Sequence, residues 1–406
     1  MRLRFFIDTK KSCNDRILSI QKYSFRMKKL LFVVNVDWFF DSHRLPIALK
    51  AIEDGFDVYL ATTVTNLQLL DKFSQHGINV FPLFVDRGAK NMISIPFLLF
   101  DLFRIFKLLN PDIVHLVTLQ PVIFGGIIAR FLRIKSVVYA ISGLGHFFLT
   151  NSMYTQARRY LILALYKIAL ANPTKKVIFQ NNRDRDILIR NCGLQLSDSC
   201  VLPGSGVDLS IFSFQPLPIG IPTVLMACRL LKSKGVHDFV EAASILKRDN
   251  YEIRFVLVGQ PDVSNPSSVT EAELTKWNDD GNVEILGFRS DLPYLMSLSH
   301  IVVLPSYYPE GLPKVLCEAA ACGRPVITTV EPGCIDAIQE GKTGLAVPSR
   351  SPLLLAEAIL QLAYNKDLLY EMSCSSRRFA EEKFCVDHIA RSHISIYNKL
   401  SHNESC

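Results

Sequence analysis

The stretch YPEGLPKVLCEAAACG holds two carboxylates, Glu310 and Glu318, with seven residues between them. The GLP sequence that follows Glu310 could start a helix, and free backbone N–H groups at such a start can bind a phosphate or a sugar hydroxyl. Glu318 falls two turns further on, where a carboxylate can accept hydrogen bonds from a ribose diol. The position of this stretch, between a strand and the helix expected at 313–322, makes the pattern more specific than two glutamates alone.

A second segment, ACRLLKSKG (227–235), supplies two cations around a turn from strand to helix. Arg229 closes the expected strand, and Lys234 stands just before Gly235 at the next helix. Arginine can bind a diphosphate through two parallel N–H groups, and lysine acts beside it as a point charge. Such a pair would neutralise the charge on a departing diphosphate, which is electrostatic catalysis. The alternative is an ordinary surface pair bound to nearby acids.

Further polar residues follow strands in the first half of the chain. Asp37, His43 and Arg44 come after the first expected strand, where an acceptor or a donor phosphate could lie. Arg44 could equally be a surface residue at the start of a helix. His115 stands at a strand end, and it is either a cleft residue or a buried structural histidine.

The sequence predicts neither a metal nor a nicotinamide cofactor. Asp184-Arg185-Asp186 has a metal-binding form, but it follows QNN at a helix start, so helix capping explains it better. The glycines of SGLGH and PGSG do not make the G-x-G-x-x-G motif that binds dinucleotides. The ten cysteines include no C-x-x-C pair, which favours reduced thiols in the cytoplasm.

Short apolar runs alternate with helical patterns in both halves of the chain. Strands are expected at 30–36, 57–62, 79–83, 112–118, 135–141 and 175–180, and then at 223–228, 253–259, 283–286, 301–304 and 325–328. Helices are expected at 44–54, 66–75, 96–109, 121–133, 155–171, 235–248, 291–299, 313–322, 352–364 and within 367–400. This alternation predicts α/β architecture, with parallel sheets covered on both faces. We expect two Rossmann-like, doubly wound domains facing a cleft that binds ligands at strand ends.

The Pro- and Gly-rich segment QPLPIGIP indicates a linker between these domains. The first domain is then 27–212, the second is 213–384, and the helix 385–400 packs back on the first. Residues 1–26 form a basic extension that lacks the features of a secretory signal. They are either a segment upstream of the natural start at Met27, disordered or not native, or a basic anchor for anionic lipid.

The net charge of +7 is unevenly distributed. Residues 87–176 contain twelve Lys and Arg but only two Asp, a net charge of +10, and they are rich in Phe, Leu and Ile. These are either ordinary solvated helix faces or a basic, apolar surface toward anionic lipid headgroups or a pyrophosphate-linked lipid. The apolar stretches 92–109 and 136–157 are too polar to span a membrane. No recognition motif accompanies the charge, so nucleic acid is not an expected partner.

Several motifs together resemble glycosyltransferase family 4. They are RLLKSKG, VLVG at 256–259, LGFRSDLPYLMSLSHIVVLPSYYPEGLPKVLCEAAACGRPVI and EPGCIDAIQEGKTGLAVP. The resemblance covers nearly all of the chain after Met27. It implies a retaining enzyme of the GT-B fold that uses a nucleotide sugar. The segments NVDWFFDSHRLPIA and ISGLGHFF are similar to those of bacterial members that extend lipid-linked O-antigen or capsule polysaccharides.

The resemblance also implies roles for individual residues. Arg229 and Lys234 would hold the donor diphosphate, and Glu318 would bind the ribose. Glu310 would meet the sugar or the distal phosphate, and it is counted with the two cations as catalytic. The other donor-binding positions are Gly259, Phe288, Arg289, Gly311, Leu312 and Pro313.

The sequence departs from the family pattern at one place in the first domain. Many members have a His-Gly pair after the fifth strand, lining the cleft. Here the matching pair is Ser142-Gly143, and His146 follows three residues later. His146 is a candidate substitute for the missing histidine.

We therefore expect a retaining hexosyl- or N-acetylhexosaminyltransferase without a cofactor or metal. Its donor would be a nucleoside diphosphate sugar, with uridine favoured. Its acceptor would be a lipid-linked saccharide of the undecaprenyl-diphosphate type, met at the anionic inner face of the cell membrane by a peripherally bound, cytoplasmic enzyme. One alternative is a UDP-N-acetylglucosamine 2-epimerase, which needs no acceptor surface. The other is a non-catalytic nucleotide-sugar-binding subunit of a polysaccharide assembly complex.

Overall fold

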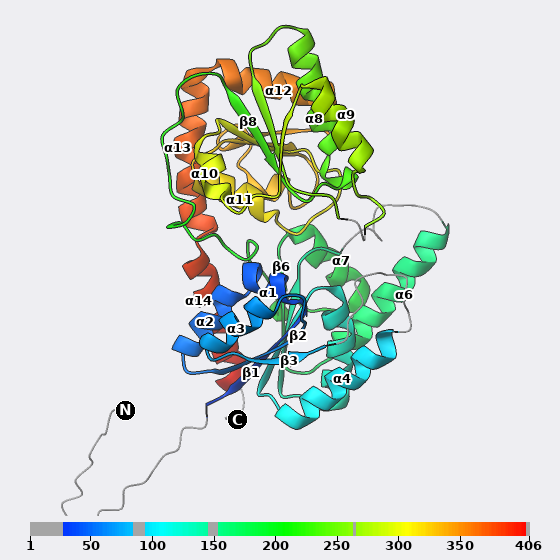
Figure 1. Cartoon of the computed structure of the whole chain (residues 1–406). Coiled ribbons are helices and arrows are strands. Elements are labelled where there is room, and N and C mark those ends of the chain that lie inside the picture. The colour runs from blue at the N-terminus through cyan, green and yellow to red at the C-terminus, as the bar shows by residue number, and fades with distance from the viewer. Residues whose placement is uncertain (1–26, 84–93, 145–152, 263–264, 403–406) are drawn as a thin grey trace, which may run out of the picture.

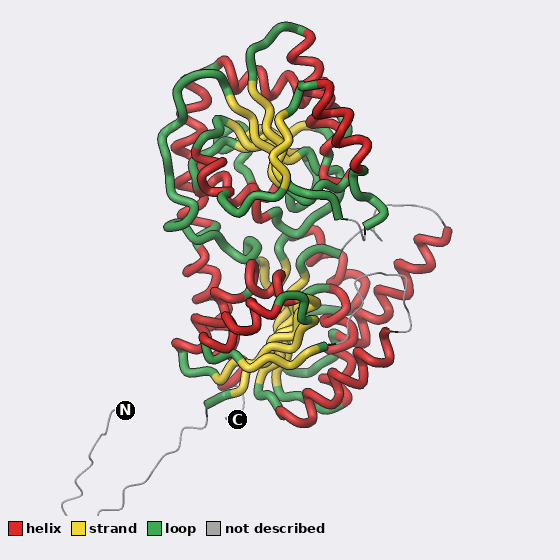
Figure 2. The backbone as a smooth tube through the Cα atoms, viewed as in Figure 1, coloured by secondary structure: helices red, strands yellow, loops and turns green. Residues whose placement is uncertain are grey.

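The computed structural model describes residues 27–83, 94–144, 153–262 and 265–402. Two parallel β-sheets, one in each half of the chain, form the centres of two domains (Figure 1). Helices cover both sheets, as the sequence predicted (Figure 2). The expected basic extension at residues 1–26 lies outside the described residues, so both interpretations of it stay predictions.

The N-terminal sheet has seven strands in the order β3-β2-β1-β4-β5-β6-β7, and every pair is parallel. The strands are β1 (Lys29–Val36), β2 (Asp57–Thr63), β3 (Asn79–Pro82), β4 (Ile113–Val117), β5 (Ser136–Ile141), β6 (Lys175–Phe179) and β7 (Ser199–Val201). Every residue of β4 and β5 is buried. Such continuous apolar strands are expected where helices cover both faces of a sheet.

Two layers of helices cover this sheet, each with its own core. The helices on one face are α1 (Asp37–His43), α2 (Leu45–Glu53), α3 (Leu67–Gln75) and the C-terminal α14 (Val386–His402). On the other face lie α4 (Ser94–Leu109), the π-helix η1 (Pro121–Gly125), α5 (Gly126–Phe131), α6 (Met153–Ala169) and α7 (Asn182–Cys192). The short 3-10 helix η3 (Leu196–Asp198) precedes β7.

The C-terminal sheet has six strands in the order β10-β9-β8-β11-β12-β13, again all parallel. The strands are β8 (Thr223–Ala227), β9 (Arg254–Val258), β10 (Glu284–Gly287), β11 (Ile301–Leu304), β12 (Val326–Thr329) and β13 (Gly344–Val347). The helices are η4 (Lys232–Lys234), α8 (Val236–Arg248), α9 (Glu271–Asp280), α10 (Leu292–Ser297), α11 (Lys314–Ala321), η5 (Ile335–Ala337), α12 (Pro352–Tyr364) and α13 (Lys366–Lys383). One large core cluster joins the sheet to these helices.

The strands and helices predicted from the sequence are present, and the structure adds α1, α9, β7 and β13. The domain boundary at 212/213 stays a prediction. The chain crosses between the sheets twice, and the two crossings lie side by side, because Val207 N–H donates to Phe384 O at 2.7 Å and Val386 N–H donates to Val207 O at 3.0 Å. The buried Arg324 donates to the carbonyl of Gln215 in the Pro-rich segment. Among the described residues, no helix is long and apolar enough to cross a bilayer.

The helix α14 returns to the N-terminal sheet and brings a buried histidine with it. His115 in β4 makes a 2.6 Å hydrogen bond through Nδ1 with the Tyr397 hydroxyl, and its ring stacks on that of His393. Burial, with smaller contributions from His393 and Arg44, lowers the pKa of His115 well below its usual range. Burial and Arg44 likewise lower the pKa of His393 to about 3. Both imidazoles are therefore neutral in the folded protein.

These lowered pKa values predict that the folded state loses stability in mild acid. The unfolded chain binds protons at histidine below about pH 6.5, whereas the folded chain does not, so stability is complete above that pH and falls below it. His115 and His393 together should lower the free energy of unfolding by about 3 kcal/mol on going from about pH 7.5 to about pH 5.5. Urea unfolding at both pH values measures this change. His393→Leu should reduce the pH dependence, and His388→Leu, at an exposed site on the same helix, should leave it unchanged.

Candidate active site

Three cavities adjoin one another where the C-terminal ends of β8, β9 and β11 face the N-terminal domain. Their volumes are about 900, 350 and 780 Å³, and Arg229 lines all three. The first contains Lys234, Glu310 and Tyr307. The second adds His43 and Gln180 from the N-terminal domain, and the third lies beside Gly259. The cavities thus form one continuous cleft, at the strand ends where parallel sheets bind ligands.

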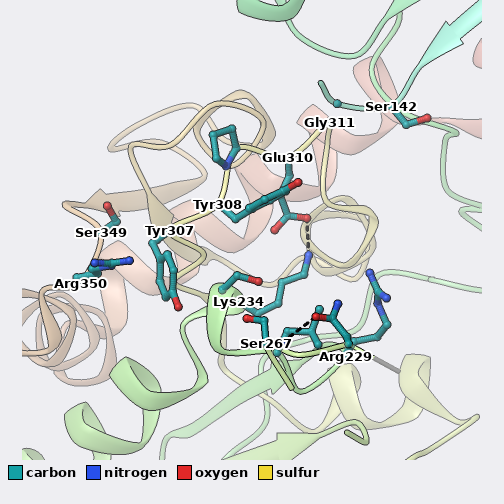
Figure 3. A pocket seen from close by; sticks show the side chains of 15 residues that line it. Ser142, Arg229, Lys234, Ser267, Tyr307, Tyr308, Glu310, Gly311, Ser349 and Arg350 are labelled. Carbon is teal, nitrogen blue, oxygen red and sulfur yellow. Dashed lines mark hydrogen bonds and ion pairs between the residues drawn. The ribbon is translucent and has the colours of Figure 1, made fainter. Parts of the chain in front are cut away.

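The two predicted cations lie together at the centre of this cleft (Figure 3). Lys234 forms an ion pair and hydrogen bond with Glu310, and both side chains are largely buried. Arg229 is more exposed and pairs with Asp262 at 3.0 Å. The turn that presents them needs Gly235, which has a φ of 77° and packs so closely on Pro305 that a Cβ would overlap its carbonyl. This arrangement explains why a glycine follows Lys234.

One carboxylate oxygen of Glu310 accepts a hydrogen bond within the protein, and the other can accept one from a ligand. Oε2 accepts from Lys234, while Oε1 is buried and has no hydrogen-bond partner among the described residues. An unpaired buried carboxylate oxygen is unfavourable unless a ligand satisfies it. A hydroxyl or N–H group of a bound molecule in this cleft would supply the missing donor.

The loop that contains Glu310 also contacts the N-terminal domain. Leu312 N–H donates to Gln180 Oε1 at 2.9 Å, and Asn181 Nδ2 donates to Glu310 O at 3.2 Å. A Cβ added at Gly311 would overlap the Gln180 side chain and approach Ser142 O at 2.6 Å. The absence of a side chain at Gly311 therefore permits the two domains to meet at this loop.

Helix α11 begins directly after this loop, with Pro313 before its first turn. Pro313 and Leu312 line the second cavity. Glu318 is buried on the helix and pairs with Lys314 at 3.6 Å, and it lies outside the residues that line the three cavities. Burial raises the pKa of Glu318, and the Lys314 charge opposes this effect. Its assignment to a ribose stays a prediction.

The third cavity is lined mainly by apolar residues. Gly259, Phe288 and Arg289 line it, together with Leu292 and with Trp38 from the other domain, and their assignment to the donor stays a prediction. Gly259 has a φ of 140°, and a Cβ there would overlap the carbonyl oxygen of Cys228. Arg289 donates two hydrogen bonds to the Asp291 carboxylate, at 2.6 and 2.8 Å.

His43 is the best-placed polar group on the N-terminal wall. Its ring stacks on Phe39 at 4.1 Å, and Nδ1 lies 2.6 Å from Ser42 Oγ. Burial, followed by the charges of Lys314 and Arg44, lowers the pKa of His43 to about 3. The imidazole is therefore neutral at physiological pH, and it can accept or donate a hydrogen bond without adding charge to the cleft. Ser142 and Gly143 line the first cavity, and His146 lies outside the described residues.

Three predicted cleft residues are instead buried in the N-terminal domain. Asp37 accepts hydrogen bonds from Thr65 and from the N–H groups of Asn66 and Trp38. Burial raises its pKa, but these hydrogen bonds outweigh burial and hold it below the usual range. Arg44 is buried between α1 and α2, and its Nη1 donates to His43 O at 3.1 Å. His115 packs against α14, so the alternative of a structural histidine is correct.

The metal-like Asp184 lies at a capped helix start, as the sequence predicted, but the residue that caps α7 is Asn181 and Asp184 stands in the first turn. Asp184 N–H donates to the side chain of the N-cap residue Asn181 at 2.8 Å, and its carboxylate accepts from Leu144 N–H. Burial raises the pKa of Asp184. No cluster of three or more possible metal ligands occurs among the residues that the structure describes.

Sequence reasoning missed several residues of the cleft. Tyr307 and Arg350 both line the first cavity, where the guanidinium lies 4.4 Å above the tyrosine ring. Gln180 and Trp38 reach the cleft from the N-terminal domain. One sequence signal could have found Gln180: it follows β6 directly, so it lies at the same sheet edge as Ser142. No such signal pointed to Arg350, because it follows β13, a strand that was not predicted.

The contact at Gly311 predicts that its substitution will separate the domains. Gly311→Ala should expand the protein in solution, because the new Cβ needs space that Gln180 and Ser142 occupy. Small-angle X-ray scattering would measure the radius of gyration. The double variant Gly311→Ala with Gln180→Ala should recover part of the compactness. An unchanged scattering profile for Gly311→Ala would contradict the close contact.

Comparisons with known proteins agree with this architecture. Residues 29–181 match the family model described as "Glycosyl transferase 4-like", and residues 221–365 match "Glycosyl transferases group 1". Among solved structures, the Anabaena protein HepE in complex with UDP has a TM-score of 0.73 at 19% identity, over 92% of this chain and 100% of that one. Sucrose-phosphate synthase of Thermosynechococcus elongatus has a TM-score of 0.75 at 20% identity, over 92% and 99%.

Two sequence relatives act on undecaprenyl-linked sugars, according to their names. The N,N'-diacetylbacillosaminyl-diphospho-undecaprenol alpha-1,3-N-acetylgalactosaminyltransferase of Campylobacter jejuni is 29% identical, over 89% of this chain and 96% of that one. The UDP-Gal:alpha-D-GlcNAc-diphosphoundecaprenol alpha-1,3-galactosyltransferase of Escherichia coli is 28% identical, over 57% and 61%. The family models, these relatives and the two parallel-sheet domains of the GT-B fold agree: the chain is a glycosyltransferase and belongs to glycosyltransferase family 4.

Proposed function

We propose that this glycosyltransferase moves a hexose or N-acetylhexosamine from a UDP-sugar to a lipid-linked saccharide of the undecaprenyl-diphosphate type, with retention at the anomeric carbon. The central observation is the grouping of Arg229, Lys234 and Glu310 in one cleft between the domains. The Campylobacter and Escherichia relatives support the acceptor class. The name of the second also supports a uridine donor.

In this proposal the diphosphate lies against Arg229 and Lys234. As the bond from the anomeric carbon to the diphosphate breaks, negative charge grows on the leaving oxygen, and both cations stabilise it. Arg229 can leave Asp262 for the diphosphate, since that pair is exposed and such pairs are weak. Lys234 can keep its contact with Glu310 while it approaches a phosphate oxygen.

The sugar would lie beside Glu310 and the backbone of Gly311. The unpaired Oε1 of Glu310 would accept a hydrogen bond from a sugar hydroxyl, which fixes the ring relative to the leaving group. The acceptor hydroxyl would attack from the same face that the diphosphate leaves, and the departing phosphate oxygen would take its proton. The uracil would occupy the third cavity, beside Gly259 and Phe288.

The first cavity is the proposed acceptor site. It opens between Ser142 of the N-terminal domain and the pair formed by Tyr307 and Arg350. Arg350 gives this side of the cleft a third cation, which suits an acceptor that itself carries a diphosphate. Because such an acceptor is anchored in a membrane, we place the enzyme at the inner, cytoplasmic face of the cell membrane.

The diphosphate role predicts a sharp contrast between two lysines of one turn. Lys234→Ala should lower kcat/KM for the donor at least about 100-fold, equivalent to about 3 kcal/mol of transition-state stabilisation, and Arg229→Ala should act similarly. Lys232→Ala is the matched control, since Lys232 lies two residues away but pairs with Glu273 outside the cavities. Initial rates of sugar transfer measure the effect. A normal rate for Lys234→Ala would exclude the diphosphate assignment.

The donor class predicts tight, metal-independent binding of one nucleoside diphosphate. Calorimetric titration of the full chain with UDP, GDP and ADP in EDTA should show binding of UDP above the others. Tight binding of another nucleotide would replace uridine as the base. If no nucleotide bound, or if binding required an added divalent cation, the proposed metal-free donor site would be wrong.

A further inference from the structure

The outward side of α4 is apolar and basic, where a helix on the surface of a globular protein is usually polar. Its inner side packs Leu98, Leu102 and Phe106 into the core of the N-terminal domain. Phe100 and Leu108 point outward, with 64% and 74% of their surfaces exposed. The exposed cations Arg104 and Lys107 follow the same helical spacing, so α4 shows a stripe of mixed apolar and basic residues to solvent.

The outward side of α6 repeats this pattern. Its inner side buries Leu163 and Tyr166. Tyr160 and Leu161 are 73% and 61% exposed, and Lys167 and Ile168 follow two turns later on the same side. Lys167 lies seven residues after Tyr160, and Ile168 lies seven residues after Leu161, which is about two helical turns and keeps them on one helix face.

Helix α5 joins these two stripes into one surface. Phe131, at the end of α5, is 74% exposed, and its ring centroid lies 6.2 Å from that of Phe103 in α4. On the other side, Arg130 Nη1 donates to Ile168 O of α6 at 3.5 Å. The three helices cover the same face of the sheet, so their outward sides point in one direction (Figure 1).

The charge of this surface is predominantly positive. No Asp or Glu occurs between Asp112 and Asp184, a stretch of 71 residues that contains nine Lys and Arg. Within α4 the one acid is Asp101, whose carboxylate lies 4.0 Å from Arg104. Exposed aromatic and aliphatic side chains interleaved with cations are the composition expected of a surface that inserts shallowly among anionic headgroups.

We propose that the outward sides of α4, α5 and α6 form a docking surface for the anionic lipid of a membrane. The inference rests on the proposed function for its biological setting, because a lipid-linked acceptor requires the enzyme at a bilayer. Large exposed apolar patches mark interaction sites, and here the excess of cations selects an anionic partner. Phe100, Phe131 and Leu161 would enter the headgroup region, while Lys107, Arg130 and Lys167 would contact lipid phosphates.

The position of α6 relates this surface to the cleft. The helix begins ten residues after Gly143, which lines the proposed acceptor cavity. It runs from beside the junction of the two domains along the outer side of the N-terminal domain (Figure 1). Docking on this surface would therefore hold the acceptor side of the cleft near the membrane, where a lipid-anchored diphosphate lies.

Vesicle binding by the full chain tests the proposal. Vesicles of phosphatidylcholine with about one third phosphatidylglycerol should bind the protein, and vesicles of phosphatidylcholine alone should bind it much less. The triple variant Lys107→Gln, Arg130→Gln, Lys167→Gln should lower the partition coefficient about 100-fold, since each cation near an anionic surface contributes about five-fold. The triple variant Phe100→Ser, Phe131→Ser, Leu161→Ser should lower it at least about ten-fold.

Two matched controls lie on the C-terminal domain. Arg248→Gln, Lys276→Gln, Lys366→Gln removes three exposed cations, and Ile219→Ser, Leu353→Ser, Tyr370→Ser removes three exposed apolar side chains. Both controls should bind vesicles like the unmodified chain. Equal losses of vesicle binding in the test and control variants would overturn the proposal. Full binding by the test variants would also overturn it, and that result is expected if residues 1–26 alone bind the membrane. If the chain bound no vesicles but formed a dimer, and if the test variants abolished that dimer, the proposal would be wrong and a second copy of the chain would occupy this surface.

Turnover separates this proposal from the proposed function. With a short-chain, water-soluble acceptor diphosphate, the test variants should keep the unmodified rate, because they are remote from the cleft. With the acceptor embedded in vesicles, their rates should fall along with their binding. Vesicle binding without turnover of either acceptor would contradict the proposed function and leave the docking surface standing. If the test variants turned over the embedded acceptor at the unmodified rate, the proposed function would stand and the docking surface would be contradicted.

Discussion

The loop from Glu310 to Leu312 is the constraint on which the cleft depends, because it is held from both domains at once. On its own domain, the Glu310 carboxylate is fixed by Lys234. From the opposite domain, Gln180 and Asn181 bind its backbone. A side chain at position 311 would separate these partners. The loop therefore couples the contact between the domains to the placement of the Glu310 carboxylate beside Lys234, so the proposed diphosphate clamp and the proposed sugar-binding group are positioned together.

The charges of the cleft are paired before any ligand arrives. Arg229 has Asp262, Lys234 has Glu310 and Lys314 has Glu318. A buried cation without a partner would be costly, and its partner carboxylate reduces that cost. An incoming diphosphate must compete with these carboxylates, which lowers affinity for anions in general. A ligand that offers several oxygens in the right geometry can satisfy the cations together, so the pairing favours a diphosphate over a single phosphate.

The structure brings together Arg229, Lys234 and Glu310, which the sequence assigned to one donor site, and their roles there stay a prediction. Arg229 and Lys234 flank a strand-to-helix turn, and Glu310 follows the neighbouring strand in the sheet, so parallel topology brings them together. The burial of Arg44 and His115 could not be read in the same way. It depends on α14, whose Tyr397 bonds His115 from 282 residues further along the chain. Arg350 was missed because it follows β13, an edge strand that was not predicted.

For the N-terminal domain, the composition gives the number of positive charges, whereas the structure shows on which surface they lie. The composition showed a stretch rich in Lys and Arg and poor in Asp and Glu. The number of charges in the stretch would be the same if every cation pointed in a different direction. The layer of α4, α5 and α6 on one side of the sheet gathers these cations into a surface.

The inner sides of these helices already have a complete core, so the apolar residues outside are not needed for folding and carry a cost in solubility. The cations beside them offset part of that cost while the surface is free in water, and they would attract anionic lipid when a membrane is near. The two domains thus differ in how they carry positive charge: the cations of the cleft are paired with carboxylates, whereas the N-terminal domain has an excess of cations that suits a partner with a diffuse negative charge.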